Sequence, residues 1–315
     1  MIDPRRFAVE RNVLIRSLRS VLAAAVAAAS FAVLPANAGA QTVDAACAEA
    51  GPAGATRTVT LSLDGFSRQY LIHEPEHARG ERLPLIFAYH GRTQSPELIE
   101  RYSQLDTLHA VVVYPAGVPG KGGKTSWSGM PTAAHGVDDI HFTRVIYERV
   151  QRTSCIDTSR VYATGKSDGG SVAGELACKA ADIFSRVASV AGAYYPIAGG
   201  CTPTRAVAIL EFHGDADTVI PYGGNVKRKL PDVHVWLSGW AQRNGCASDE
   251  GPKHTSAAIT MHRWSGCRDG VTVTGYRIHG GGHTWPGATS PSGPGATSQA
   301  IDATPLIAKF FGISG

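Results

Sequence analysis

The feature that most constrains how this chain folds is the alternation of short apolar runs with amphipathic helical patterns. Leu83–His90 and Ala110–Pro115 are near-continuous apolar runs, typical of strands buried on both faces of a parallel sheet. Asp64-Gly65 separates two alternating stretches, Arg57–Leu63 and Gln69–His73, and predicts an opening hairpin. Further strands are expected at Arg160–Thr164, Val187–Ala191, Ala206–Phe212 and Val271–His279, and helices from Ser95-Pro96 and at Val137–Val150, Gly169–Lys179, Val233–Gln242 and Ile301–Phe311. This order predicts an α/β fold with a mostly parallel central sheet and helices on both faces.

The first forty residues predict a secretory signal peptide. Residues 1–20 carry five arginines and two acidic residues, and Val21–Leu34 is an uncharged run of 14 residues. Such a run is too short to span a bilayer and has the length of a signal-peptide core. Small residues suit cleavage after Ala38 or Ala40. We therefore expect a secreted protein, extracellular or periplasmic, with no membrane partner in its mature form.

The net charge gives no sign of a nucleic-acid partner. The whole chain carries +4, of which residues 1–40 supply +3. After residue 40 the longest run of Lys or Arg is the three residues 227–229, whereas nucleic-acid-binding proteins usually present an extended basic stripe or face. We therefore expect no nucleic acid among the partners.

All six cysteines lie after residue 40, and an even count in an exported chain predicts up to three disulfides. None stands in a C-x-x-C pair, and no HExxH-type spacing is present, so we expect neither a metal site nor a cofactor. Six cysteines allow 15 connectivities. From their positions in the sequence, we expect the pairs Cys246–Cys267, Cys178–Cys201 and Cys47–Cys155.

Residues 41–315 are expected to form one domain. Pro286–Ser298 is rich in Pro, Gly and Ser, which is a composition that linkers share. Only 17 residues follow this segment, and they are too few to form another domain. We therefore interpret the segment as a surface loop.

The strongest local motif is the Gly165–Gly169 segment, which reads Gly-Lys-Ser-Asp-Gly. It follows a predicted strand and precedes a predicted helix, as the G-x-S-x-G elbow requires. The turn is so sharp that glycines are needed on both sides, and it exposes the serine hydroxyl at the carboxyl end of the sheet. Ser167 is therefore the candidate nucleophile.

A serine hydroxyl needs a base to take its proton and an acid to orient that base. Asp215 and Asp217 both follow the predicted strand Ala206–Phe212, and we favour Asp217 because it lies farther out in the loop. His283 follows three glycines after the last predicted strand, whereas His279 falls within that strand. The expected triad is therefore Ser167, Asp217 and His283.

Acyl transfer also needs two N–H groups aimed at the developing oxyanion. We expect one from Asp168, directly after the nucleophile, and one from Arg92, in the loop after Leu83–His90. Three aromatic residues stand in loops expected to flank the site, where they either contact a substrate or pack the loops: Trp127, Tyr222 and Trp285.

These motifs resemble those of secreted α/β-hydrolase esterases, the polyhydroxybutyrate depolymerase-like and feruloyl esterase-like family. The matching stretches run in family order and are residues 64–75, 85–91, 136–142, 159–178, 212–224 and 280–287. The resemblance implies an α/β-hydrolase fold, and it implies Ser167, Asp217 and His283 as nucleophile, acid and base. The chain departs from the family pattern at Lys166 and Asp168, on either side of the serine.

The leading hypothesis is a serine esterase that cleaves acyl esters on plant cell-wall polysaccharide through an acyl-enzyme, as feruloyl esterases do. An alternative is a polyhydroxybutyrate or polyhydroxyalkanoate depolymerase or oligomer hydrolase. Many depolymerases that act on solid polymer carry a further polymer-binding domain, which we do not expect here. A second alternative is a non-catalytic binding protein on a hydrolase scaffold, which a missing triad residue would favour.

Overall fold

The computed structural model describes residues 46–48 and 54–313. The predicted leader, residues 1–40, and its cleavage sites lie outside the described residues. Among the residues that are described, no helix is long and apolar enough to cross a membrane.

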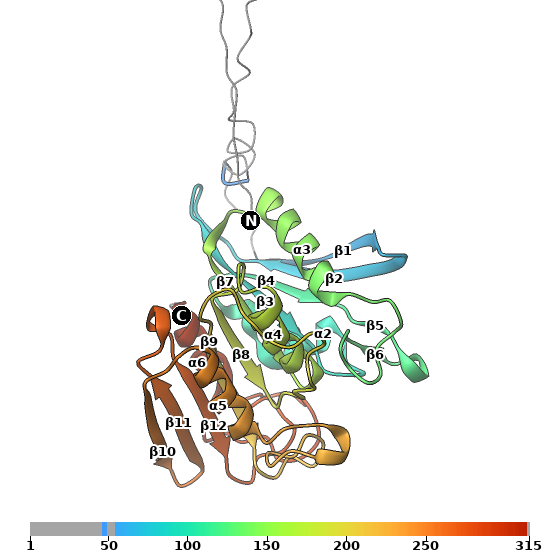
Figure 1. Ribbon diagram of the computed structural model, residues 1–315. Coiled ribbons are helices and arrows are strands. Elements are labelled where there is room, and N and C mark those ends of the chain that lie inside the picture. The colour runs from blue at the N-terminus through green and yellow to red at the C-terminus, as the bar shows by residue number, and fades with distance from the viewer. Residues whose placement is uncertain (1–45, 49–53, 314–315) are drawn as a thin grey trace, which may run out of the picture. The chain divides into compact units, whose positions relative to one another are not determined.

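Ten strands form one mixed sheet in the order β1-β2-β4-β3-β7-β8-β9-β12-β11-β10 (Figure 1). The central strands, from β4 to β12, run parallel, and antiparallel pairs close both edges. A separate antiparallel pair joins β5 to β6. The strands are β1 (Ala55–Leu63), β2 (Phe66–Glu74), β3 (Leu83–Tyr89), β4 (Val111–Pro115), β5 (Val118–Pro119), β6 (Thr125–Ser126), β7 (Ile156–Lys166), β8 (Arg186–Val190), β9 (Ala208–Gly214), β10 (Ser248–Ser256), β11 (Ile259–Ser265) and β12 (Val273–Ile278).

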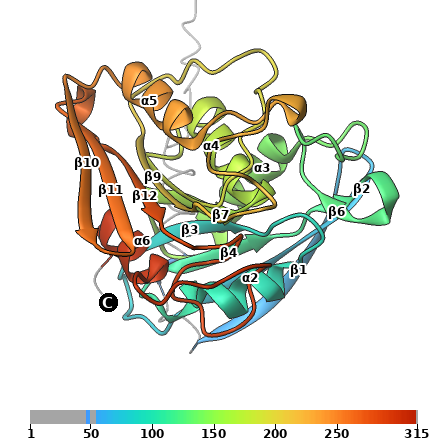
Figure 2. The ribbon, with the colours of Figure 1, turned by 90° about the horizontal axis from the view of Figure 1, so that it is seen from below.

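Helices cover both faces of the sheet, as the sequence predicted. Figure 2 shows α3 (Asp139–Thr153), α4 (Asp168–Lys179) and α5 (Val233–Arg243) on one side, and α2 (Pro96–Ser103) and α6 (Ala303–Phe311) on the other. Each layer buries its own apolar cluster against the sheet. Short 3₁₀ turns lie at Leu105–Thr107, Lys121–Gly123, Val226–Arg228 and Arg268–Gly270.

The centre of the sheet is apolar for the reason that the sequence pattern suggested. Every residue of β3 and of β4 is buried, because helices cover both faces of these parallel strands. The opening hairpin pairs β1 with β2 across the Asp64-Gly65 turn, and both turn residues have positive φ. Pro96 occupies the first turn of α2 after Ser95, which suits its fixed φ.

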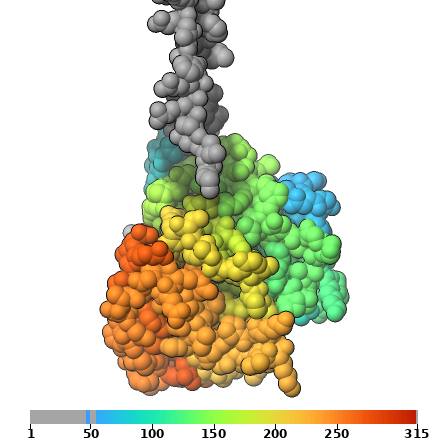
Figure 3. All heavy atoms as spheres, viewed as in Figure 1, coloured from blue at the N-terminus to red at the C-terminus, as the bar shows by residue number. Residues whose placement is uncertain are grey.

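The sequence analysis did not predict the hairpin β10–β11. Every residue of β10 is at least partly exposed, and the strand contains Gly251 and Pro252, so it lacks the alternation that marks a half-buried strand. Gly and Pro are tolerated there because β10 is an edge strand, and its ladder is irregular at that point. In the space-filling view this orange part of the surface lies opposite the blue part that belongs to β1 (Figure 3).

Three disulfides join Cys47 to Cys155, Cys178 to Cys201 and Cys246 to Cys267. These are the pairs that the sequence analysis expected. Among the described residues no cysteine is free. Cys246 follows α5 and Cys267 precedes β12, so their bridge ties a helix to the strand on which it packs.

Replacing both Cys246 and Cys267 by Ala should lower the free energy of unfolding by about 3 kcal/mol, the chain-entropy value for a loop of this length. Denaturant titration of the oxidised protein and of the double variant would measure the loss. The far-ultraviolet circular dichroism spectrum at low temperature serves as the control, and it should be unchanged because the bridge acts mainly by constraining the unfolded chain. Equal unfolding midpoints would contradict the prediction.

Candidate active site

The candidate site lies where several parallel strands end. Ser167 follows β7, Asp217 lies three residues after β9, and His283 follows β12. Because the carboxyl ends of parallel strands share one edge of a sheet, the order of these strands brings residues distant in sequence to that edge. All three side chains are buried.

Ser167 occupies a strained turn between β7 and α4. Its backbone adopts φ 58° and ψ −123°, a conformation that costs energy for a residue with a side chain. Hydrogen bonds hold the turn in place: the Ser167 N–H donates to the Val190 carbonyl at 2.9 Å, and the Ala193 N–H donates to the Ser167 carbonyl at 3.2 Å. Gly169 is required because a Cβ there would collide with the Tyr89 carbonyl oxygen. The local geometry is therefore that of the predicted elbow.

Asp217 and His283 form a buried pair. The Nδ1–H of His283 donates to Asp217 Oδ2 at 2.6 Å. Asp217 Oδ1 accepts from the N–H groups of Val219 and Ile220, both at 2.8 Å. The backbone thus fixes the carboxylate, and the carboxylate fixes the tautomer and orientation of the imidazole, which leaves Nε2 free to act as a base.

The electrostatics suit an ionised acid beside a neutral base. Burial raises the pKa of Asp217, but the contacts from His213 and His283 outweigh it and hold this pKa well below its usual range. Burial lowers the pKa of His283; the hydrogen bond to Asp217 opposes this effect, and the charge of Lys166 adds to it. At neutral pH the pair is therefore carboxylate and neutral imidazole, the state that general-base catalysis requires.

A second buried pair, which the sequence analysis did not single out, lies behind Asp217. His213 Nδ1 is 2.9 Å from Glu211 Oε1, and its Nε2 is 2.8 Å from the Ile220 carbonyl oxygen and 3.5 Å from Asp217 Oδ2. Burial opposes the charge on His213, but Glu211 and Asp217 raise the pKa of His213 to about 10. A signal was present in the sequence, since Glu211 interrupts the apolar run Ala206–Phe212.

The competing residues, Asp215 and His279, pair with each other near the surface. Asp215 Oδ2 accepts from His279 Nδ1 at 2.9 Å and from Arg277 Nε at 3.1 Å, and Asp215 Oδ1 accepts from the Gly280 N–H at 2.8 Å. These contacts tie the loop after β9 to the loop after β12. The Asp217–His283 pair is therefore buried, whereas the Asp215–His279 pair lies nearer the surface and connects two loops.

One expected oxyanion donor, Asp168, directly follows the serine, and the other, Arg92, directly follows Gly91, which lies against the serine. A Cβ on Gly91 would lie 3.2 Å from the Ser167 Cβ, so the loop after β3 passes against the nucleophile. In that loop the Gly91 N–H donates to Gln94 Oε1 and the Thr93 N–H donates to the Thr125 carbonyl, whereas the structure gives the Arg92 N–H no partner among the described residues. Asp168 begins α4, where the first N–H groups have no intrahelical acceptor.

Two of the three aromatic residues considered for substrate contact are misplaced for that role. The Trp127 and Trp285 side chains are fully buried. The Trp127 Nε1–H donates to the His90 carbonyl at 2.8 Å, and the Trp285 Nε1–H donates to Thr304 Oγ1 at 3.0 Å. The interpretation of these residues as stacking surfaces was wrong, because both indoles pack the loops and present no free face.

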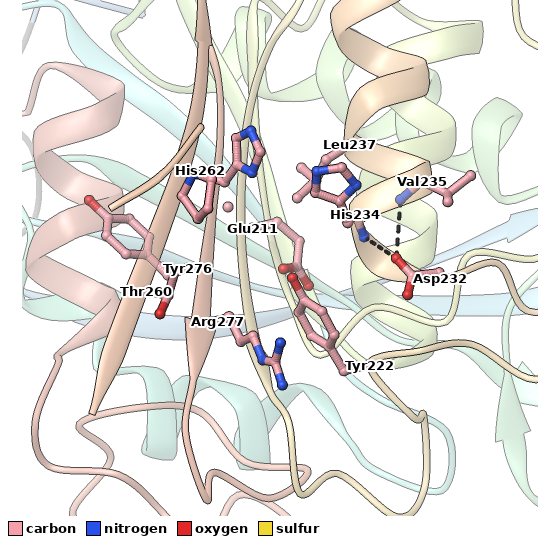
Figure 4. A pocket seen from close by; sticks show the side chains of 12 residues that line it. Glu211, Tyr222, Asp232, His234, Val235, Leu237, Thr260, His262, Tyr276 and Arg277 are labelled. Carbon is pink, nitrogen blue, oxygen red and sulfur yellow. Dashed lines mark hydrogen bonds between the residues drawn. The ribbon is translucent and has the colours of Figure 1, made fainter. Parts of the chain in front are cut away.

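Tyr222 differs from the tryptophans because it lines a cavity of about 490 Å³ between α5 and the strands β9, β11 and β12 (Figure 4). Its ring meets His213 edge-on, with 5.9 Å between ring centroids. The Arg277 guanidinium lies 5.0 Å from the centroid of the Tyr222 ring. Tyr222 therefore stands between the cavity and His213, which lies behind Asp217. Within the described residues, no group of three or more His, Cys, Asp or Glu is placed to hold a metal ion.

Comparison with known proteins places the chain in a family. No family model matches the chain. Feruloyl esterase D of Neurospora crassa is 30% identical over 261 residues, which cover 76% of this chain and 82% of that protein. Feruloyl esterase B of Piromyces equi is 29% identical over 234 residues, and the match covers 69% of this chain but only 42% of the longer relative.

Among solved structures, an acetyl xylan esterase from Aspergillus awamori superimposes with a TM-score of 0.56. The match covers 82% of this chain and 99% of that one at 16% identity, so it shows a shared fold, that of the α/β-hydrolases. The sequence relationship to the Neurospora protein is closer and extends over most of both chains. The chain belongs to the feruloyl esterase family of α/β-hydrolase esterases.

Proposed function

We propose that the protein is a serine carboxylic ester hydrolase that removes feruloyl-type acyl groups from plant cell-wall polysaccharide. The observation that carries the proposal is the buried Asp217–His283 pair at the edge of the sheet where the strained Ser167 turn lies. The relatives named as feruloyl esterases support the choice of acyl group. No cofactor is needed for this chemistry.

In the proposed reaction, the Ser167 Oγ attacks the ester carbonyl carbon while His283 Nε2 takes the hydroxyl proton. The N–H groups of Asp168 and Arg92 then stabilise the negative charge on the carbonyl oxygen. Collapse of this intermediate breaks the bond to the alcohol, which leaves with the proton from His283, and a feruloyl-serine ester remains. Water, activated by the same imidazole, releases the acid and restores the serine.

We further propose that the enzyme acts outside the cytoplasm after removal of residues 1–40. The three disulfides support this location, because such bonds persist in oxidising compartments. Its partner is then the acylated polysaccharide itself. Neither a nucleic acid nor a membrane is part of the proposal.

Replacing Ser167 by Ala should abolish ester hydrolysis and labelling by a fluorophosphonate, because both require the hydroxyl as nucleophile. His283→Gln should lower kcat by roughly 10³-fold or more, and Asp217→Asn somewhat less. Asp215→Asn is the matched control: it alters an aspartate–histidine pair two residues away and should retain most activity. Loss of activity in the control with full activity in Asp217→Asn would reassign the acid. A wild-type protein that no fluorophosphonate labels would instead be a non-catalytic binding protein.

The acyl preference is tested with purified residues 41–315. We expect kcat/KM for methyl ferulate to exceed that for hydroxybutyrate oligomers, because the relatives that match over most of this chain include several named feruloyl esterases. Acetylated xylan and 4-nitrophenyl esters of increasing chain length complete the panel. Faster turnover of the oligomers would favour a polyhydroxyalkanoate hydrolase.

We propose that Tyr222 contacts the substrate from the wall of its cavity. Tyr222→Ala should lower kcat/KM for a feruloylated oligosaccharide. The loss of transition-state stabilisation should be about 1–2 kcal/mol, the value of a lost aromatic contact with some buried area. Tyr222→Phe is the control, since it keeps the ring and removes only the hydroxyl. Comparing the kinetics on the oligosaccharide and on methyl ferulate would show whether Tyr222 contacts the sugar or the acyl group. Unchanged constants for the Ala variant on both substrates would remove Tyr222 from the site.

A further inference from the structure

Lys166, directly before the nucleophile, is a buried cation that the proposed reaction does not use. It ends β7, and its side chain is 1% exposed. Among the described residues, the structure gives its ammonium neither a hydrogen bond nor an ion pair. A buried charge without a close partner is costly, and an apolar side chain of similar length would avoid that cost. A lysine at this position therefore calls for a functional explanation.

The lysine head lies against the loop that carries His283. A Cβ on Gly293 would lie 2.7 Å from Lys166 Nζ, and the same Cβ would collide with the His283 carbonyl oxygen. The His283 N–H donates to the Pro294 carbonyl at 2.9 Å, which holds this part of the loop together. The Lys166 ammonium and the main chain of His283 thus both lie next to Gly293.

Three charged or titratable side chains act on the His283 imidazole: Asp217 from the loop after β9, His213 from β9 and Lys166 from β7. Asp217 favours the protonated ring, whereas the two cations oppose it. The charges of Asp217 and Asp168 in turn favour the protonated form of Lys166.

The charge of Lys166 persists over the pH range in which His283 gains its proton. Burial lowers the pKa of Lys166 to about 8, while Asp217 and Asp168 oppose the decrease. Asp168 also faces the guanidinium groups of Arg92 and Arg228. Because an ordinary histidine titrates near pH 6.5 and burial lowers the pKa of His283 further, Lys166 is a cation throughout that titration.

We propose that Lys166 is a positioning residue that acts on the general base by charge: its ammonium opposes a proton on His283 and keeps the imidazole able to accept the Ser167 proton in mildly acidic solution. The inference rests on the proposed esterase function of the same site. The proposal predicts the direction in which the pH profile shifts. Activity falls when acid protonates His283, and the Lys166 charge moves that fall to lower pH.

The test is the pH dependence of kcat/KM for methyl ferulate in wild type, Lys166→Met and Lys166→Gln. Both variants remove the charge, and the acid-side midpoint should rise by about 0.5–1 pH unit, the effect of one like charge withdrawn from a buried site. Lys166→Arg keeps the charge and should retain the wild-type midpoint. Above both midpoints, where His283 is neutral in variant and wild type alike, the ratio of variant to wild-type rates should be constant.

A merely structural role would lower kcat/KM by the same factor at every pH and leave the midpoint where it was, which would overturn the proposal. An acid-side midpoint that moved to lower pH in Lys166→Met or Lys166→Gln would also overturn the proposal. The rate at which a fluorophosphonate labels Ser167 gives a second profile that does not depend on the acyl group. If wild type is labelled and hydrolyses esters but the midpoints coincide, this inference alone fails. If wild type shows neither reaction, the proposed function fails first.

Discussion

The carboxylate of Asp217 is the group on which the rest of the site depends. One of its oxygens accepts two backbone N–H groups, and the other accepts the proton of His283 Nδ1. A carboxylate fixed by backbone donors cannot rotate away, so the imidazole has one tautomer and one orientation. The loop after β9 therefore determines the direction in which the His283 imidazole points, although the proposed nucleophile, Ser167, follows β7, two strands away in the sheet.

Behind Asp217 the charge pattern continues into the core. Both ring nitrogens of His213 face oxygen acceptors, those of Glu211 and Ile220, and a ring with two acceptors must carry two protons. Glu211, His213 and Asp217 thus alternate in sign inside the protein. Buried charges are tolerated when each is paired and hydrogen-bonded, which explains how an acid and a histidine occupy a strand that is otherwise apolar. The Tyr194 hydroxyl also donates to Glu211 Oε1, whereas Glu211 Oε2 has no hydrogen-bond partner among the described residues.

Much of the fold and the core of the site could be predicted from the sequence because they depend on local patterns. Buried parallel strands are continuous apolar runs, and the elbow around Ser167 needs glycines that only such a turn requires. Edge strands such as β10 lack any comparable pattern, since solvent accepts almost any side chain there. The Glu211–His213 pair was missed because its role depends on the contact between His213 and Asp217, and the spacing of residues in the sequence does not predict that contact.

The buried tryptophans show why an aromatic residue in a loop is a poor guide to ligand contact. Trp127 donates to the His90 carbonyl, and His90 in turn accepts from the Gly117 N–H and pairs with the Gly91 carbonyl. Burial lowers the pKa of His90 to about 4, so this ring is neutral: Nε2 accepts and Nδ1 donates. Its two bonds therefore hold the loop whose next residue, Arg92, supplies a proposed oxyanion donor.

Trp285 has the matching role on the other side of the site. Its backbone N–H donates to the Ser292 hydroxyl oxygen at 2.8 Å, and its indole N–H donates to the hydroxyl of Thr304 at the start of α6. The loop that begins at His283 is thereby tied to a helix on the far face of the sheet. Large side chains buried beneath loops cost little and remove many alternative loop conformations. The buried tryptophans therefore fix the backbone of the loops next to Ser167 and His283, a role that depends on their burial.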